Sequence, residues 1–245
     1  PSPITDAIDF ITISTLGNGA DFGDLTDSRY SGASSSNAIR AVFGGGWSPG
    51  HTDIIDFITI ATLGNAADFG NLTSSRYLPA GAASRTRAVF MGGHRNPNAT
   101  QQDTVDYVQI MSTGDATDFG DLSYGGAYRG GLASSTRGIF ASASSDETYD
   151  YVTISSQGGA NDFGEAPDTT RNGATFNDSV RGFNAGGSDP AKTSNIRGMI
   201  IASTGSFFDA GDLTQIGVYM SGASSPTRGI IFGGAFPANS SKNID

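Results

Sequence analysis

Ile8-Asp9-Phe10-Ile11-Thr12-Ile13 opens a unit that the chain repeats. It returns as Ile-Asp-Phe-Ile-Thr-Ile at residues 55–60, as Val-Asp-Tyr-Val-Gln-Ile at 105–110 and as Tyr-Asp-Tyr-Val-Thr-Ile at 149–154. A fifth, diverged copy at residues 195–201 carries Arg197 in place of the aspartate. The first two aspartates, Asp9 and Asp56, are 47 residues apart. Short β-rich runs repeated at this period are typical of propeller blades, each of which buries its faces only against its neighbours.

Spacing within each copy is fixed, and length varies in one loop only. In each copy, the aspartate of an Asp-Phe-Gly-like element follows the strand aspartate by 12 residues, with Arg197 replacing the strand aspartate in the fifth copy. An arginine that opens an apolar strand follows 19 residues later. These frame arginines are Arg40, Arg87, Arg137, Arg181 and Arg228. From each frame arginine to the next copy the distances are 16, 19, 13, 16 and 17. Repeat arrays tolerate length changes in surface loops on one face, which is often the binding face.

Four strands are expected in each copy. The first is a run of small residues (31–34, 80–83 and 221–224), the second begins at the frame arginine, the third is the Ile-Asp-Phe run and the fourth is the Asp-Phe-Gly element. The sequence therefore predicts an all-β fold, a five-bladed β-propeller of four-stranded antiparallel blades, as a single domain over residues 1–245. Since the chain starts on a third strand (8–14) and ends after a second strand (228–234), the N- and C-terminal strands should share one blade and close the ring.

Composition excludes several classes of function. The net charge is -10, from 24 acidic and 14 basic residues, which argues against nucleic-acid binding. No apolar run approaches the length of a membrane span, so no membrane insertion is expected. The absence of cysteine removes disulfides, zinc-thiolate sites and cysteine nucleophiles.

Neither a metal nor a cofactor is expected. Asp21 and Asp24 of the first Asp-Phe-Gly element could suggest repeated calcium sites. A calcium loop, however, needs six or more oxygen ligands, and Asp and Gly at the start of a strand are ordinary turn formers. The frame arginines are likewise interpreted as structural, either paired with the third-strand aspartate or bonded to the backbone.

Candidate binding residues lie where the symmetry breaks, in the variable loops after the second strand and in the connections from the fourth strand to the next first strand. The only Trp, both His and both Lys of the chain are in the variable loops. Aromatic rings with polar edges suit a sugar ring or a protein partner. The alternative is that loops vary only because the fold tolerates it. The candidate ligand-binding residues are Arg29, Tyr30, Trp47, His51, Arg76, Tyr77, His94, Arg95, Asn96, Asp146, Glu147, Lys192 and Phe236.

The repeat resembles known families. Gly-Gly at the end of the second strand, followed by a variable loop and an apolar strand, resembles the kelch repeat, with Phe in place of the kelch Trp of the fourth strand. Residues 56–73 more closely resemble the tandem propeller repeats of virion proteins of marine and cyanobacterial phages, in tail fibres or capsid appendages. The resemblance implies a virion location, a non-enzymatic role as an appendage or decoration, and a host-surface glycan or other virion proteins as partners.

Two other functions stay open, a free or secreted microbial lectin-like propeller and a propeller glycoside hydrolase. A glycosidase needs two convergent carboxylates roughly 5–10 Å apart. The variable loops offer only Asp103, Asp146, Glu147 and Asp189 for this, and no motif marks them. The sequence favours a protein that is not an enzyme. Because the side chains differ from loop to loop, we expect one composite site instead of one site per blade.

Overall fold

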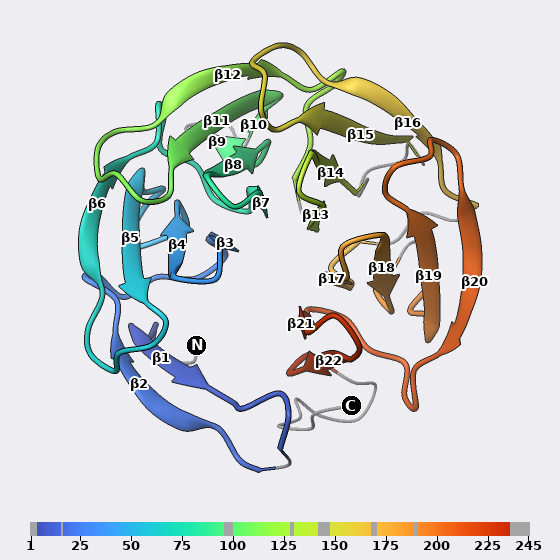
Figure 1. Ribbon diagram of the computed structural model, residues 1–245, viewed down its shortest axis with the longest axis horizontal. Coiled ribbons are helices and arrows are strands. Elements are labelled where there is room, and N and C mark those ends of the chain that lie inside the picture. The colour runs from blue at the N-terminus through green and yellow to red at the C-terminus, as the bar shows by residue number, and fades with distance from the viewer. Residues whose placement is uncertain are drawn as a thin grey trace. The chain divides into compact units, whose positions relative to one another are not determined.

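A computed structural model describes residues 4–15, 17–95, 100–127, 130–141, 148–167, 171–188 and 191–235. Every regular element in these ranges is a β-strand (Figure 1). The chain divides into two compact units, Pro1–Ala127 and Tyr128–Asp245. Among the residues that the structure describes, no helix has the length and apolarity that a membrane span requires.

The first unit contains two four-stranded antiparallel sheets. One consists of β3 (Ala33–Ser36), β4 (Arg40–Gly44), β5 (Ile54–Thr59) and β6 (Ala67–Asn71), and the other of β7 (Ala80–Ala83), β8 (Arg87–Met91), β11 (Thr104–Gln109) and β12 (Thr117–Asp121). Two pairs of strands complete the unit, β1 (Ala7–Phe10) with β2 (Ala20–Asp24), and the short β9 (His94–Arg95) with β10 (Thr100–Gln101).

The second unit repeats the same meander. One sheet consists of β13 (Gly131–Ala133), β14 (Arg137–Phe140), β15 (Thr148–Thr153) and β16 (Asn161–Glu165), and the next of β17 (Ala174–Asn177), β18 (Arg181–Ala185), β19 (Asn195–Ile200) and β20 (Phe207–Asp212). A two-stranded sheet, β21 (Ser221–Ser224) with β22 (Gly229–Phe232), follows. The predicted four-stranded antiparallel sheets are therefore confirmed, although β3 starts at Ala33 and not at the expected Ser31, because Ser31 is in a left-handed turn (φ 58°).

The Asp-Phe-Gly element forms a β-bulge in the fourth strand. Ile55 of β5 lies opposite Gly70 and Asp56 lies opposite Asp68, so Phe69 is the extra residue. Every pairing of a third with a fourth strand has a similar irregularity. The Asp68 carboxylate accepts a hydrogen bond from the Gly70 N–H (3.2 Å), and Phe69 is buried. This carboxylate stabilises the bulge, as expected of a turn former.

The bulge also joins neighbouring sheets. The Gly114 N–H, in the turn between β11 and β12, donates to the Phe69 carbonyl oxygen (2.7 Å). Gly70 has a φ of 142°, and a Cβ atom there would lie 2.5 Å from the Gly114 backbone. Gly23 and Gly64 meet in the same way. Only glycine permits both the backbone angle and this close approach.

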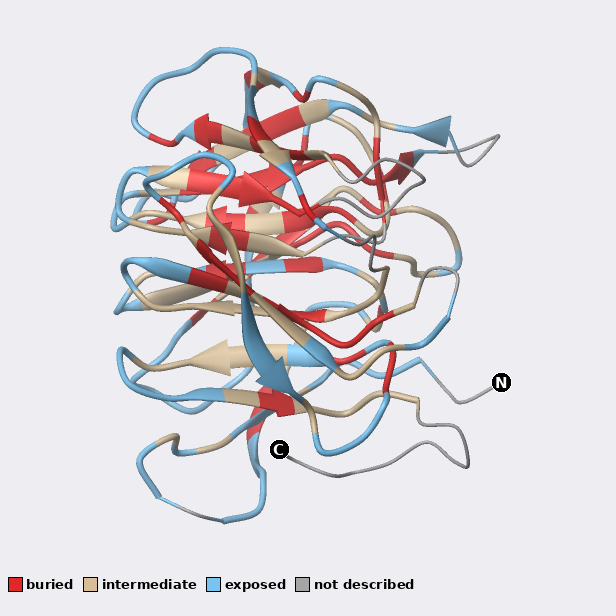
Figure 2. Ribbon diagram, turned by 90° about the vertical axis from the view of Figure 1, so that its right-hand side faces the viewer, coloured by how far each residue is buried: buried red, intermediate tan, exposed pale blue. Residues whose placement is uncertain are grey.

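Side chains fill the space between neighbouring sheets. In the first unit Val42, Ile55 and Phe69 of one sheet belong to the same buried cluster as Phe90 and Ile110 of the next. A second buried cluster, in the other unit, includes Leu132, Ile139, Phe163 and Met199. Buried residues concentrate in the strands, whereas many of the turns between strands are exposed (Figure 2). Within each unit, neighbouring sheets therefore bury side chains against one another.

Candidate functional site

The variable loops share a backbone scheme with the connections that precede the first strands. Tyr30 and Trp47 exchange backbone hydrogen bonds (2.9 and 3.2 Å), and Tyr77 and His94 do the same (2.8 and 3.1 Å). In the second unit Arg171 and Ser188 are paired in this way. These bridges bring residues from the two kinds of loop together at one end of the sheets, as the meander topology predicts.

Four of the candidate residues form a cluster of rings in the first unit. The rings of His51 and Tyr77 are stacked, with centroids 4.6 Å apart, and Tyr77 is stacked on His94 at 5.3 Å. The Trp47 indole packs by its edge against His51 (4.9 Å) and Tyr77 (5.7 Å). Trp47, His51 and Tyr77 are half-buried and His94 is buried. We call Trp47, His51, Tyr77 and His94 the aromatic cluster.

A closed loop orients Trp47 and His51. The Thr52 N–H donates to the Gly46 carbonyl oxygen (3.0 Å), and the Ser48 N–H donates to the Gly50 carbonyl oxygen (2.7 Å). Trp47 and His51 are consequently bridge partners within the loop. Aromatic side chains fixed by backbone bonds present a preformed surface, which lowers the entropic cost of binding.

His51 is neutral near pH 7. Burial, followed by the charge of His94, lowers the pKa of His51 below its ordinary value of about 6.5. Its Nδ1 atom is buried and has no hydrogen-bond partner among the described residues. The aromatic cluster therefore offers a largely apolar surface with a few polar edges, the composition common in small-molecule sites.

Arg29 and Arg76, which were predicted to contact a ligand, have buried side chains that form ion pairs. The Arg76 guanidinium is fully buried and pairs with Asp106 at 2.8 Å, and Arg29 pairs with Asp56 at the same distance. Burial lowers the pKa of Arg76, an effect that Asp106 opposes. Each guanidinium also donates to a second-strand carbonyl oxygen, that of Phe90 for Arg76. Both arginines have a structural role, because each guanidinium neutralises a buried aspartate of a third strand.

The frame arginines have different partners from these. Arg40 Nη1 donates to the Ile110 carbonyl oxygen of the next sheet (3.2 Å), and its guanidinium lies 4.5 Å from the centre of the Phe57 ring. Arg137 bonds to the Ile201 carbonyl oxygen in the same way (3.1 Å). The prediction of backbone-bonding arginines is confirmed at these two positions. The alternative prediction, an ion pair between Arg40 and Asp56, is wrong, because the Asp56 carboxylate pairs with Arg29.

The remaining candidates are dispersed or outside the described residues. Tyr30 is 50% exposed beside Trp47, and Arg95 is exposed on β9. Lys192 is exposed in the second unit, where it forms a bridge with Ser188. The candidates that lie outside the described residues are Asn96, Asp146, Glu147 and Phe236.

Sequence reasoning missed the partners of the buried arginines. The available signal was the recurrence of Arg-Tyr at residues 29–30 and 76–77, each eight residues after the aspartate of the Asp-Phe-Gly element. A constant spacing from the repeated elements indicates a structural role for these arginines and not a role in ligand binding. Within the described ranges, His, Asp and Glu side chains form no group of three that could hold a metal ion.

Comparison with family models and with curated proteins finds no match to this chain.

Proposed function

We propose that the chain is a five-bladed β-propeller that acts as a non-enzymatic binding module on a phage virion and holds a host-surface glycan through its variable loops. The observation that carries the binding role is the aromatic cluster. Its rings come from three loops and contact one another at one end of the sheets. Flat apolar rings with polar edges match the alternating CH and OH groups of a sugar. The virion location rests on the resemblance of residues 56–73 to phage propeller repeats.

Ring closure is supported by the two-stranded sheets. The pair β1–β2 corresponds to the third and fourth strands of a blade, and β21–β22 corresponds to the first and second. Joined, they make one four-stranded blade, the fifth. In the complete blade of β3–β6, Val42 lies opposite Phe57. The equivalent residues of the fifth blade are Ile230 and Phe10.

Disulfide crosslinking tests the closure. The chain has no cysteine, so a Phe10→Cys, Ile230→Cys double variant can form one disulfide only. Opposite residues in antiparallel strands have Cα atoms about 4.5–5.5 Å apart, within the reach of a disulfide. A Phe10→Cys, Ile231→Cys control points the second thiol to the opposite face. Closure predicts rapid oxidation of the first pair only, and equal oxidation of both pairs would contradict it.

Glycan binding is tested with an array followed by substitution of Trp47. The Trp47→Ala variant should lose most of the affinity for any glycan that the chain binds, because a central aromatic anchor often contributes about 2 kcal/mol or more. Tyr219→Ala is the matched control, since Tyr219 is 66% exposed on a corresponding connection of the second unit. Titration should give one site per chain.

Three results would remove the proposal. These are affinity that Trp47→Ala leaves unchanged, several equivalent sites per chain, and protection of the turns around residues 17–20 and 64–67 instead of the variable loops. Binding to a purified virion protein and to no glycan would assign the surface to a protein partner. Mass spectrometry of purified virus particles checks the location.

A further inference from the structure

The turn between the first and second strands begins with a carboxylate in one copy. Three residues before each frame arginine, a side-chain oxygen accepts a hydrogen bond from the backbone N–H of that arginine, at 2.6–3.2 Å. The residues at this position are Asn37, Ser84, Ser134, Asp178 and Ser225. Asp178 alone brings a negative charge to this turn.

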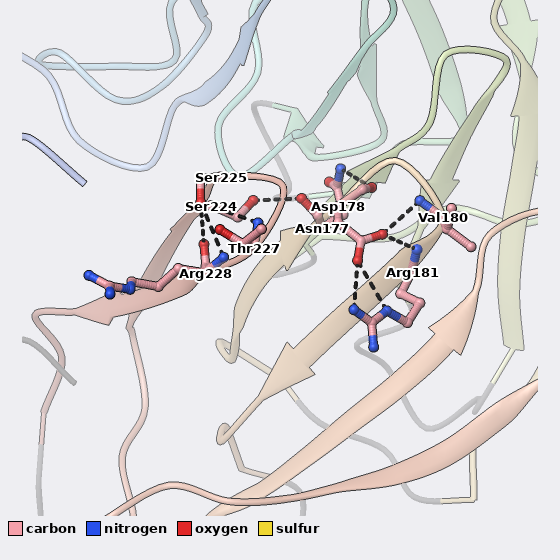
Figure 3. Close-up of polar contacts among 8 residues, drawn as sticks. All are labelled: Asn177, Asp178, Val180, Arg181, Ser224, Ser225, Thr227 and Arg228. Atoms are coloured by element: carbon pink, nitrogen blue, oxygen red, sulfur yellow. Dashed lines mark hydrogen bonds and ion pairs between the residues drawn. The ribbon is translucent and has the colours of Figure 1, made fainter. Parts of the chain in front are cut away.

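In this copy the frame arginine has a different partner. Arg181 donates to the Asp178 carboxylate through Nε and Nη2, both at 3.0 Å (Figure 3). Arg40 and Arg137, whose turns carry Asn and Ser, instead reach the next sheet and bond to a carbonyl oxygen there. A two-pronged, charge-assisted bond is stronger than a bond to a neutral carbonyl. Asp178 therefore holds Arg181 on its own turn.

A cavity lies beside this ion pair. Its volume is about 150 Å³, and it is lined by the β17–β18 turn with Phe176 and Phe183 and by the β21–β22 turn from Ser224 to Gly229. A cavity of this size can hold one six-membered ring. It is at the end of the sheets opposite to the variable loops, so it does not depend on the proposed function.

The aromatic wall of the cavity is also specific to this copy. Phe176 stacks on Phe183, with centroids 5.1 Å apart and planes inclined by 15°. The other copies have Ser35, Ala82, Leu132 and Ala223 at the position of Phe176. Gly229 makes room for the ring, because a Cβ atom there would lie 2.4 Å from Phe176.

The polar groups of the cavity suit an anion. Two arginines, Arg181 and Arg228, and the carboxylate of Asp178 line it. The Arg181 side chain is 52% exposed, and no described residue bonds to its Nη1 atom. Although its partial burial works against ionisation, the bonds from Arg181 and Val180 hold the pKa of Asp178 below its ordinary value. The pair is thus ionised at neutral pH.

We propose that this cavity binds a single hexuronate unit. Its carboxylate would pair with the open edge of the Arg181 guanidinium, the geometry that arginine recognises best. The sugar ring would contact the edges of Phe176 and Phe183, and a ring hydroxyl would bond to Thr227, which lines the cavity.

NMR titration of the ¹⁵N-labelled chain tests the site. D-glucuronate should shift the amide signals of residues 176–183 and 224–229, with a Kd on the order of 1 mM. D-glucose, which has the same ring without the carboxylate, should bind at least about tenfold more weakly. Methyl β-D-glucuronide tells whether the end of a glycan chain is accepted. Binding of either uronate supports the proposal, and shifts that are absent with both, or equal with glucose, overturn it.

Two variants locate the site. Arg181→Gln should weaken glucuronate binding by at least about tenfold, while Arg137→Gln, the same change in the preceding sheet, should leave it within about twofold. Phe176→Leu should weaken binding too, and it should fold, because Leu132 occupies this position in the preceding sheet. Thermal melts confirm folding. Affinity that Arg181→Gln and Phe176→Leu both leave unchanged would refute the site.

Discussion

The variable loop of the first complete sheet and that of the sheet formed by β17–β20 share a set of backbone hydrogen bonds but carry different side chains. Thr52 N–H donates to the Gly46 carbonyl oxygen at 3.0 Å, and Thr193 N–H donates to the Gly187 carbonyl oxygen at the same distance. The side chains at equivalent positions differ completely, Trp47 against Ser188 and His51 against Lys192. Backbone bonds and glycines thus fix the loop conformation, which leaves the side chains free to change.

The support beneath the two loops differs as well. Gly46 N–H donates to the Arg76 carbonyl oxygen (2.9 Å), whereas Gly187 N–H donates to that of Gly217 (2.8 Å). Only the first loop therefore rests on a residue whose side chain forms a buried ion pair. The comparison separates three contributions, namely the buried pair, the glycine scaffold and the exposed side chains.

The largest expected effect is at the buried pair. Arg76→Met should lower the free energy of unfolding by about 3–5 kcal/mol, because Asp106 then stays buried without its partner. Chemical denaturation followed by circular dichroism measures the loss. Arg95→Met, at an exposed position, is the control and should change stability by about 0.5 kcal/mol or less. Similar losses in the two variants would mean that the ion pair contributes little.

Alanine substitution of the loop glycines, Gly46 in one loop and Gly187 in the other, should lower stability by similar amounts. Gly46 has a φ of 118° and Gly187 a φ of 102°, so an Ala at either position is strained by about 1–3 kcal/mol. A Cβ atom at Gly46 would also lie 2.9 Å from the Tyr30 carbonyl oxygen. Melting curves of the two variants should shift together, with the exposed Pro49→Ala as an unaffected control. A loss confined to one loop would break the equivalence.

Exchange of the exposed side chains should cost less. Trp47→Ser removes two edge contacts between rings and should cost roughly 1 kcal/mol. Ser188→Trp in the second unit should change stability by about 0.5 kcal/mol or less, because the scaffold does not depend on this side chain. Denaturant midpoints measure both changes. A Ser188→Trp variant that fails to fold would show that the loop chemistry is not interchangeable.

The smallest effect is the titration of His51. Because its pKa is lowered in the folded state, the unfolded chain takes up the proton more readily. This contribution leaves stability unchanged above pH of about 6.5 and reduces it as the pH falls below that value. NMR titration of the imidazole should give a midpoint below 6.5, and His51→Gln should remove part of the decline in melting temperature. A midpoint above 6.5 would contradict the burial of this ring.

Repetition made most of the strands predictable. The small-residue runs at 80–83 and 221–224 coincide with β7 and β21, and the frame arginines Arg40, Arg87, Arg137 and Arg181 each start a second strand. Fixed spacing across copies locates strands because insertions cannot enter a packed core. The closed ring of five blades stays a prediction.

Side-chain partners were harder to predict. The sequence placed Trp47, His51, Tyr77 and His94 among the loop residues, but a spacing rule does not say that three of the rings stack. Arg29 was predicted on the variable-loop face because the connection that carries it emerges there, yet its side chain is buried in an ion pair with Asp56. Loop-length variation does not indicate the cavity at Asp178, because this residue lies in a turn of constant length.

The contact between Gly70 and Gly114 has an evolutionary consequence. The bond between neighbouring sheets is made by backbone atoms and two glycines, and it recurs between Phe22 and Gly64, between Phe69 and Gly114 and between Phe163 and Gly205. A duplicated copy inserted between two existing ones would find both of its interfaces ready, with no matching substitution needed in either neighbour. Gene duplication could therefore lengthen such a chain without a stage of poor packing, and each new copy would be free to acquire its own loop chemistry.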